Sequence, residues 1–363
     1  MNLDQRVVHY FDWTWFLALV LLSGAGLVAI WSVTNATGWD SYLGRHSIYL
    51  CAALMVFVAL LYFDYHDYAD FIAFAYLAGI ATLVLVLFIG RTINSNRSWI
   101  YLGSIGFQPS EFMKVLVVVA LAKYYSEIDS DHLGVHELAV GGAIVLLPML
   151  LVMLQGDLGT AVTFLPVYGA LSVLAGLRRK HLLVFILAGV AAAPVGWMML
   201  RDYQKSRIET VFKPDSDPLH SGYQTRQSKI AIGSGRFLGK GFRQGSQSQL
   251  GFLPARQTDF VFAVIAEERG FIGGMSVLGL FLLISMKLLQ CAREAKDRLG
   301  NLIVVGVLSL FLFHAMINIG MVVGLLPIAG IPLPFVSAGG SALISFFAAM
   351  SLCMNVKLRR FVN

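Results

Sequence analysis

The sequence predicts an all-α polytopic membrane protein with about ten transmembrane helices and a large extracellular loop between helices 7 and 8. Hydrophobic residues make up 57% of the 363 residues and charged residues only 13%, and the mean hydropathy is +0.73. Long apolar runs recur along the chain, and each crossing of a membrane core ~30 Å thick needs ~20 apolar residues. A β-barrel is excluded, because the run from Val115 to Ala122 is apolar on both faces that a strand would have.

Each predicted span is a long apolar run bounded by polar residues. The first run is too long for a signal-peptide core and lacks a small-residue cleavage site, so we interpret it as a helix. The ten spans are predicted near residues 13–34, 46–63, 70–90, 108–125, 138–155, 159–176, 181–200, 260–290, 300–323 and 339–356. The chain, residues 1–363, is interpreted as a single membrane domain in which 201–259 is the large extracytoplasmic loop.

Basic residues gather on one side of this topology, after the sixth and eighth spans and at both ends of the chain. The positive-inside rule makes that side cytoplasmic, so both termini are predicted to be cytoplasmic. Ten Lys and Arg residues nevertheless lie between Arg201 and Gln257, on the opposite side. Loops of about 60 residues escape the rule. These charges therefore indicate an anionic partner, and Asp259, at the start of the next span, marks the candidate site.

The connection between the third and fourth spans ends in Gln108-Pro109-Ser110, a typical helix start because proline fits the first turn. Glu111 and Lys114 follow three residues apart and share one helix face. They are interpreted as an ion pair inside the bundle, as the lining of a polar cavity open to the outside, or as both. Arg97, just before this helix, is a candidate anion contact.

Asp157 lies in a short polar break between the fifth and sixth spans, flanked by Gly156 and Gly159. One interpretation is that it caps the sixth span by accepting hydrogen bonds from exposed N–H groups. The other is that it faces the same outer cavity as Glu111. The sequence leaves both open.

The large loop contains two predicted helices. Tyr203–Phe212 has the spacing of a short amphipathic helix in the headgroup layer, with Lys205 and Arg207 toward lipid phosphates. Gly222–Ile232 is the second helix, and glycine ends it. Between them, Asp215–Pro218 is predicted to form a turn.

Glycine then alternates with basic and amide residues up to the next span. Such a backbone can approach a phosphate closely. Together with Arg236, Lys240 and Arg243, this segment predicts binding of a diphosphate or a lipid headgroup. The scattered cysteines predict neither a disulfide framework nor a metal site.

Long ordered motifs extend over nearly the whole chain: FQPSEFMK, QGDLGTA, DPLHSGYQTRQSKIAIGSG, GKGF, GSQSQLGFLP, TDFVFAVIAEE and INIGMVVGLLPIAGIPLPFVSAGGSALI. With these motifs the chain resembles the shape, elongation, division and sporulation family. Its large loop resembles the RodA elongation branch more than the FtsW division branch.

The resemblance implies a ten-helix peptidoglycan glycosyltransferase that polymerises lipid II into glycan strands and releases undecaprenyl diphosphate. It also implies a class B penicillin-binding protein that supplies transpeptidation, and an elongation machinery that maintains rod shape. The implied location is the bacterial cytoplasmic (inner) membrane, with the active site on the extracytoplasmic face. A divalent cation, Mg²⁺ or Mn²⁺, is implied, while no metal ligands and no nucleic-acid partner are predicted.

The family's motifs carry over to particular positions. Its essential catalytic aspartate, in the TDF motif, matches Asp259, and its QPSE motif with the following lysine matches Gln108 to Glu111 and Lys114. The late PLPFVSAGGS segment matches Pro332 to Ser341. The predicted substrate-binding residues are Arg97, Glu111, Lys114, Asp157, Arg236, Lys240, Arg243, Arg256 and Ser337.

Two departures from the family pattern bear on mechanism. Ala255 and Gln257 stand where the family usually has Glu and His before TDF, so a mechanism that uses that His as the base is not expected. Gly156 replaces the proline of the QPDLG motif, which loosens the turn before Asp157. Neither departure touches Asp259.

Polymerisation requires a carboxylate that takes the proton of the attacking sugar hydroxyl and cations that hold the departing diphosphate. Asp259 supplies the carboxylate. Burial would raise its pKa from about 3.9 and nearby arginines would lower it, and the sequence leaves the balance open. The structural alternative is that Asp259 only caps the next helix. A single carboxylate without a covalent partner predicts inversion at the anomeric carbon.

Two other functions fit parts of the pattern, a lipid II transporter or flippase and a non-catalytic scaffold for a penicillin-binding protein. A transporter needs polar groups that continue to the cytoplasmic side, or broken helices in matching halves. Here the strongest polar motifs lie at the outer ends of the spans. A scaffold leaves Asp259 without a role.

Overall fold

The computed structural model describes residues 10–34, 41–93, 96–103, 105–213, 217 and 221–360. Helices occupy all ten predicted spans, which confirms the predicted fold class; Thr163 divides the sixth span into α8 and α9. The span helices are α2 (Trp13–Val33), α3 (Tyr42–Leu60), α5 (Ile72–Ile89), α6 (Pro109–Ser126), α7 (Val135–Leu154), α8 (Leu158–Val162), α9 (Phe164–Leu174), α10 (Arg179–Met199), α14 (Val261–Glu294), α15 (Arg298–Val322) and α16 (Gly340–Arg359).

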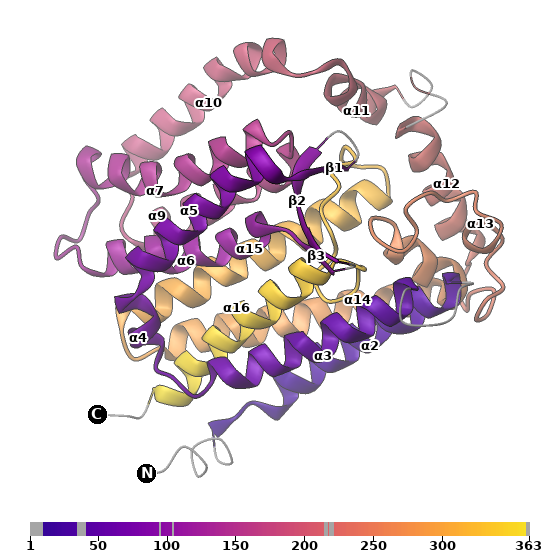
Figure 1. The fold of residues 1–363 in the computed structure, drawn as a ribbon, viewed down its shortest axis with the longest axis horizontal. Helices are drawn as coiled ribbons and strands as arrows, with labels where there is room; N and C mark the ends of the chain where they lie inside the picture. The colour runs from indigo at the N-terminus through magenta and orange to yellow at the C-terminus, as the bar shows by residue number, and fades with distance from the viewer. Residues whose placement is uncertain are drawn as a thin grey trace.

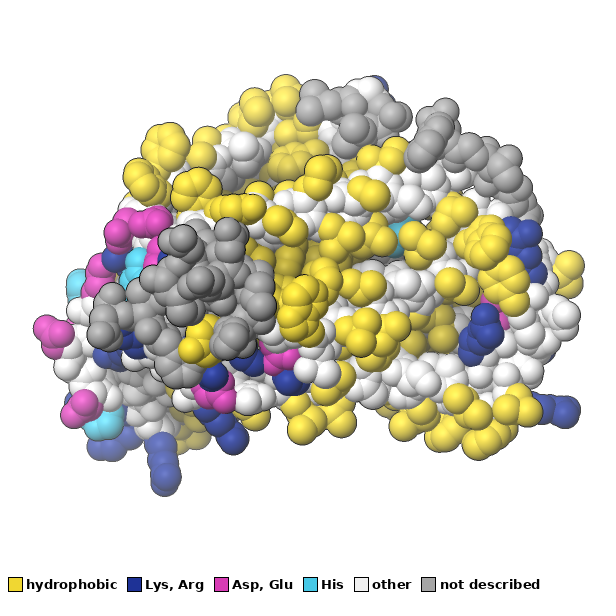
Figure 2. Space-filling view, turned by 90° about the horizontal axis from the view of Figure 1, so that it is seen from below, with side chains coloured by type: hydrophobic (Ala, Val, Ile, Leu, Met, Phe, Trp, Pro, Cys, Tyr) yellow, Lys and Arg dark blue, Asp and Glu magenta, His cyan; other side chains and the backbone are white. Residues whose placement is uncertain are grey.

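Among the described residues, eight helices are long and apolar enough to cross a membrane. Of the other two predicted spans, α6 carries Glu111, Lys114 and Lys123, and α8 with α9 forms a shorter apolar stretch, Leu158–Leu174. In Figure 2, apolar side chains spread over the middle of one face, and charged side chains gather toward the end that holds the termini in Figure 1. The chain is a multi-pass membrane protein.

Helix α16 lies within the bundle and packs against α3, α15 and α6 (Figure 1). Its Phe347 is fully buried and meets Phe57 of α3 edge to face, with ring centroids 6.2 Å apart. Lipid tails are as apolar as a leucine side chain, so apolar side chains gain little by moving from lipid into a helix interface. Close packing, which small residues permit, therefore drives helix association in a membrane. Gly306 of α15 is such a residue, since a Cβ there would lie 2.6 Å from Val118 Cγ1 of α6.

Helix α10 departs from this compact arrangement. It arches along one side of the molecule, away from the other spans (Figure 1). Its apolar side chains are largely exposed, 57% for Leu183, 68% for Val190 and 78% for Met198. An aromatic contact between Tyr168 of α9 and Phe185, with centroids 5.9 Å apart, joins its first half to the bundle.

Helix α14 is longer than the predicted span 260–290 and is kinked. Gly270 has φ 66° and ψ −159°, which breaks the helical geometry. This conformation favours glycine, and a Cβ would lie 2.3 Å from the backbone nitrogen of Gly239. At this kink, α14 therefore packs directly against the glycine-rich loop, residues 235–254.

The connection between α5 and α6 is more ordered than a helix-only fold predicts. It forms a three-stranded antiparallel sheet of β1 (Arg91–Ile93), β2 (Asn96–Leu102) and β3 (Ile105–Phe107), in the order β1-β2-β3. Tyr49 of α3 fastens this sheet, because its hydroxyl donates to the carbonyl of Gly106 and accepts from the N–H of Gly106, both at 3.1 Å.

Both helices predicted in the large loop are present. They are α11 (Asp202–Phe212) and α12 (Ser221–Ser234). The same loop also contains the short helix α13 (Ser246–Gln249), and the short helix α4 (Tyr65–Asp70) lies between α3 and α5. The predicted turn Asp215–Pro218 lies outside the described residues except for Asp217, whose carboxylate accepts from the Ser221 N–H at 3.2 Å.

Candidate active site

Asp259 lies immediately before α14, where the chain leaves the large loop. Its N–H donates to the carbonyl of Ala255 at 3.0 Å, and its own carbonyl accepts from the side-chain amide of Asn318 at 3.1 Å. The N-cap of α14 is Phe260, which makes no side-chain capping bond. Capping therefore does not account for Asp259, and the carboxylate is available for another role.

Burial raises the pKa of Asp259 above its ordinary value. A hydrogen bond from Thr258 and the positive charge of Arg207 oppose this effect, but burial prevails. The balance that the sequence left open therefore favours a carboxyl group with a raised pKa. Such a group is a stronger base than an aspartate in water.

Helix α15 and the segment before α16 hold the backbone around Asp259. The Asn318 amide also donates to the carbonyl of Ile331 at 2.8 Å, and the N–H of Ala338 donates to the carbonyl of Gln257 at 2.9 Å. The predicted substrate residue Ser337 lies in this segment, where its hydroxyl accepts from the Leu333 N–H at 2.9 Å. Ser337 is buried and closes a turn, and its role toward substrate stays a prediction.

Glu111 and Lys114 form the ion pair that the sequence suggested, with 2.8 Å between Oε2 and Nζ. Both side chains are buried, 2% and 1% exposed. Lys114 Nζ also lies 3.1 Å from His314 Nε2, and His314 Nδ1 lies 3.3 Å from the carbonyl of Pro332. The ammonium group donates and Nε2 accepts, so Nδ1 carries the proton and donates to Pro332.

Asp157 is the N-cap of α8, as one of its two interpretations held. Its Oδ1 accepts from the Thr160 N–H at 3.1 Å, and its Oδ2 from the Thr160 hydroxyl at 2.9 Å. It also meets the α6 motif, because Gln108 donates its side-chain amide to Asp157 Oδ2 at 3.0 Å. The backbone N–H of Gln108 donates to Ser341 at 2.9 Å. The start of α6, the turn before α8 and the start of α16 are far apart in sequence and thus meet at Gln108.

Several predicted cations donate to protein carbonyls. Arg97 donates to the carbonyls of Leu87 and Gly90, at 2.9 and 3.0 Å, where α5 ends. Arg256 donates to the carbonyls of Ser248 and Gln249. Their assignment as substrate contacts stays a prediction, since a ligand would compete with these acceptors.

Glu267 of α14 binds the glycine-rich loop, although it lies in a predicted span. Its carboxylate is fully buried and pairs with Lys240 at 2.8 Å. It also accepts from the backbone N–H groups of Gln247 at 2.9 Å and Ser248 at 3.0 Å. Backbone donors that the sequence suggested for phosphate thus bind this carboxylate.

Glu268 anchors the same loop to α2. It accepts from the N–H of Arg243 at 3.2 Å and from the hydroxyl of Ser32. The Arg243 guanidinium donates to the carbonyl of Trp31 at 3.2 Å and lies 5.7 Å from the centre of that ring. Arg236 is exposed, and its carbonyl accepts from the Phe271 N–H at 2.9 Å. A phosphate-binding role for these two arginines stays a prediction.

The glycines of this loop permit close packing on α14. A Cβ on Gly235 would lie 2.0 Å from the carbonyl oxygen of Ala266, and one on Gly239 would lie 2.2 Å from that of Glu268. Gly239 also has φ +84°, which disfavours a side chain. The glycine pattern is therefore explained by packing between loop and helix.

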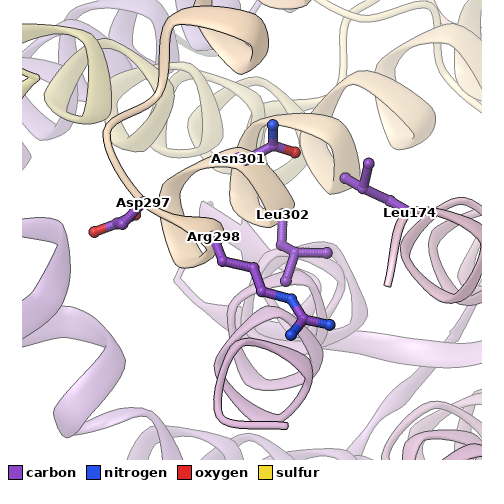
Figure 3. A pocket seen from close by; sticks show the side chains of 5 residues that line it. All are labelled: Leu174, Asp297, Arg298, Asn301 and Leu302. Carbon is purple, nitrogen blue, oxygen red and sulfur yellow. The ribbon is translucent and has the colours of Figure 1, made fainter. Parts of the chain in front are cut away.

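A cavity of about 320 Å³ lies at the other end of α15, lined by Leu174, Asp297, Arg298, Asn301 and Leu302 (Figure 3). With 1.5 Å of rise per residue, about 25 Å of helix separates Asn301 from Asn318. Two of its polar side chains make structural bonds: Asp297 accepts from the Gly300 N–H at 2.7 Å, and the Asn301 amide donates to the carbonyl of Ala292 at 2.9 Å. This cavity is distinct from the Asp259 site.

Three residues near the site were not among the predicted site residues. They are Arg207, which was expected to face lipid phosphates, and His314 and Asn318. The last two are four residues apart on α15 and so share one face of this largely apolar helix. Polar residues within a span commonly mark a functional site, so this pair was the available signal.

Fold and site together define a multi-pass membrane protein with a partly buried carboxylate at the entrance of its longest helix. Residues 11–360 match the model of the FtsW, RodA and SpoVE family, described as cell cycle proteins. The chain belongs to this family.

Relatives match over nearly their whole length. The peptidoglycan glycosyltransferase MrdB of Escherichia coli K12 is 36% identical over 355 residues, which cover 97% of this chain and 94% of that protein. The peptidoglycan glycosyltransferase RodA of Treponema pallidum is 31% identical, covering 98% and 99%. Stage V sporulation protein E of Bacillus subtilis is 34% identical, covering 96% and 88%.

Solved structures share the fold. A chain from a peptidoglycan synthase complex that coordinates polymerization and crosslinking superimposes with a TM-score of 0.82 at 30% identity, covering 98% of this chain and 100% of that one. The rod shape determining protein RodA of Thermus thermophilus gives a TM-score of 0.74 at 27% identity, covering 98% and 99%.

Proposed function

We propose that this chain is a peptidoglycan glycosyltransferase that polymerises lipid II during cell elongation, with Asp259 as the general base. Relatives with that activity in their names match it from end to end. The observation that carries the mechanism is the placement of Asp259. Burial raises the pKa of the Asp259 carboxyl group, and this side chain does not cap α14. Asn318 holds its backbone carbonyl in place.

In the proposed reaction, a sugar hydroxyl of one substrate attacks the anomeric carbon of the other. The hydroxyl oxygen forms the new glycosidic bond while the bond from that carbon to undecaprenyl diphosphate breaks and its electron pair leaves with the diphosphate. Asp259 accepts the hydroxyl proton. Attack opposite the leaving group inverts the anomeric centre, in keeping with one carboxylate and direct displacement.

The Glu111 and Lys114 pair supports this chemistry from within the bundle. The Lys114 ammonium is held by Glu111 at 2.8 Å and by His314 at 3.1 Å, so its charge is fixed in place. A fixed charge in a dry site stabilises developing negative charge without reorganising. We assign the pair to this electrostatic role, and Asp157 to holding Gln108 beside it.

The divalent cation implied by family resemblance is part of the proposal as an ion that arrives with the substrate diphosphate. Among the described residues, no group of three or more His, Cys, Asp or Glu side chains could hold a metal ion. Magnesium is commonly bound by one or two carboxylates together with substrate phosphates. We assign Asp259 as the carboxylate that would bind such an ion.

The partner and the orientation follow from the same proposal. A class B penicillin-binding protein supplies transpeptidation, in line with the fold shared with a chain of a complex that couples polymerization to crosslinking. Both termini face the cytoplasm and Asp259 faces the outside of the inner membrane. Basic residues at the cytoplasmic ends of α14 and α16, such as Arg293 and Arg359, support this orientation.

The experiment that tests this function compares polymerisation with transport. The purified chain, with its penicillin-binding partner, is given fluorescent lipid II in detergent, and glycan strands are resolved on a gel. The same protein in vesicles is assayed for movement of labelled lipid II across the bilayer. We expect glycan strands from the wild-type chain. Lipid movement without any polymer would instead establish a transporter.

A further inference from the structure

Arg207 of α11 points toward the protein interior, which corrects the expectation that it faces lipid phosphates. Its Nη1 donates to the carbonyl of Ile328 at 3.2 Å. The guanidinium also lies 5.7 Å from the centre of the Tyr203 ring, one turn earlier on the same helix. Arg207 is partly buried, so one face of α11 packs on the protein.

Tyr203 and Arg207 bind α11 to two segments of the site. The Tyr203 hydroxyl donates to the carbonyl of Gly156 at 3.5 Å, in the turn before Asp157. Arg207 binds Ile328, and three residues later the carbonyl of Ile331 accepts the amide of Asn318. That same amide holds the carbonyl of Asp259. The backbone segment from Ile328 to Ile331 thus links Arg207 to Asn318, which holds the carbonyl of Asp259.

The charge of Arg207 has no carboxylate partner in the part of the chain that the structure describes. Its contacts are the Ile328 carbonyl and the Tyr203 ring, both uncharged. Yet its positive charge acts on Asp259 and partly lowers the pKa of that carboxyl group. By contrast, Lys114 and Lys240 each form an ion pair with a carboxylate, Glu111 and Glu267 respectively.

A guanidinium carries five N–H donors in a rigid fork that matches phosphate oxygens in pairs. A neutral carbonyl uses one of them, and a charge-assisted bond to an anion is about twice as strong as a neutral one. An anion that enters beside Asp259 can therefore displace the Ile328 carbonyl from Arg207 without breaking an ion pair.

We propose that Arg207 binds the diphosphate of the polyprenyl substrate beside Asp259 and exchanges the Ile328 carbonyl for diphosphate oxygens when the lipid enters. This rests on the proposed function, which supplies the diphosphate. Arg207 then holds the leaving group while Asp259 takes the proton from the attacking hydroxyl. Because α11 follows α10 directly, seating of the diphosphate also fixes the start of the large loop over the site.

The test measures binding, so it does not depend on turnover. The wild-type chain and the variants Arg207→Gln, Arg207→Lys and Lys205→Gln are placed in phosphatidylcholine nanodiscs, and Kd is measured for undecaprenyl diphosphate and for uncharged undecaprenol. Each variant must elute as a single species on size exclusion. Lys205→Gln removes a charge from the same helix and is the matched control. Arg207→Lys keeps the charge but loses the fork, and provides a second variant.

We expect Arg207→Gln to raise the Kd for undecaprenyl diphosphate by about tenfold or more, and Arg207→Lys to raise it less. Lys205→Gln should stay within about twofold of wild type, and undecaprenol should bind all four proteins equally. Unchanged affinity of Arg207→Gln for the diphosphate would overturn the inference. The inference would also be overturned if wild type and Arg207→Gln bound undecaprenyl diphosphate equally in phosphatidylglycerol nanodiscs, because Arg207 would then bind bulk lipid headgroups.

The inference and the proposed function fail in different ways. If the wild-type chain binds the diphosphate through Arg207 but makes no glycan from lipid II, the function is refuted and the inference stands. If the chain polymerises lipid II while Arg207→Gln binds the diphosphate normally, the inference is refuted and the function stands.

Discussion

The side-chain amide of Asn318 donates a hydrogen bond to the backbone carbonyl of Asp259 at 3.1 Å. Asn318 is fully buried near the end of α15, and its second amide hydrogen binds the carbonyl of Ile331 at 2.8 Å. A single side chain therefore sets the position of the proposed base relative to the segment that precedes α16. Because Asn318 does not touch the carboxylate itself, it is a positioning residue.

Asn318→Leu should reduce kcat by about tenfold to a hundredfold, since loss of both donors leaves two carbonyls without this partner and lets Asp259 shift. Thermal stability should fall as well. Asn301→Leu is the matched control, because it removes one donor from the far end of α15. It should lower the melting temperature while kcat stays near wild type. Equal kcat losses in the two variants would show that the Asn318 bond has no specific role.

The raised pKa of Asp259 predicts a pH-dependent stability. The folded protein holds this proton more tightly than the unfolded chain does. The stabilisation is complete below the unfolded pKa of about 3.9 and is lost as the pH rises through the folded pKa. Asp259→Asn has no such loss, so above this window its melting temperature should exceed that of wild type.

Melting temperatures of both proteins between about pH 3.5 and 8 test this prediction. Asp129→Asn, which alters an exposed carboxylate between α6 and α7, serves as the control. A difference between wild type and Asp259→Asn that does not change with pH would show that Asp259 titrates alike in the folded and unfolded states.

The buried pair of Glu111 and Lys114 should show strong coupling. Lys114→Met alone leaves the Glu111 charge buried and should cost about 3–5 kcal/mol in unfolding free energy. The double variant Glu111→Gln with Lys114→Met removes both charges and should recover most of that loss. Lys123→Met, which breaks more exposed pairs on the same helix, should cost less than about 1 kcal/mol. A double variant no more stable than Lys114→Met would contradict the pairing.

Glu267 should control the order of the glycine-rich loop. Glu267→Gln removes the charge that binds Lys240 and weakens the acceptor for the N–H groups of Gln247 and Ser248. Hydrogen exchange at those two amides should accelerate by about tenfold. Arg269→Gln changes an exposed charge two residues later on α14 and should leave them protected. Unchanged exchange in Glu267→Gln would mean that the loop is held by other contacts.

The spans could be predicted from sequence because each depends on a local property, the length of an apolar run. The Glu111 and Lys114 pair was predictable for the same reason, since three residues on a helix fix which face they share. The small sheet was missed because its strands are short, of three and seven residues, and carry weak periodicity.

The contacts around Asp259 join residues far apart in sequence, and no local pattern encodes them. Asn318 and Asp259 are separated by 59 positions, and Arg207 and Ile328 by 121. The orientation of the Arg207 side chain depends on how α11 packs on the protein. The amphipathic spacing of α11 shows only which residues share a helix face with Arg207. Glu267 lies within a predicted span, and its bonds to Lys240 and to the glycine-rich loop depend on how that loop packs on α14.

The measurement that tests the central claim most directly is the rate at which Asp259→Asn polymerises fluorescent lipid II beside its penicillin-binding partner. The variant keeps the shape of the side chain, and Asp129→Asn controls for the chemical change. We predict that Asp259→Asn loses about 10²- to 10⁴-fold in rate, the usual contribution of a general base, while it still binds undecaprenyl diphosphate. Glycan strands made by Asp259→Asn at the wild-type rate would contradict the assignment of Asp259 as the base.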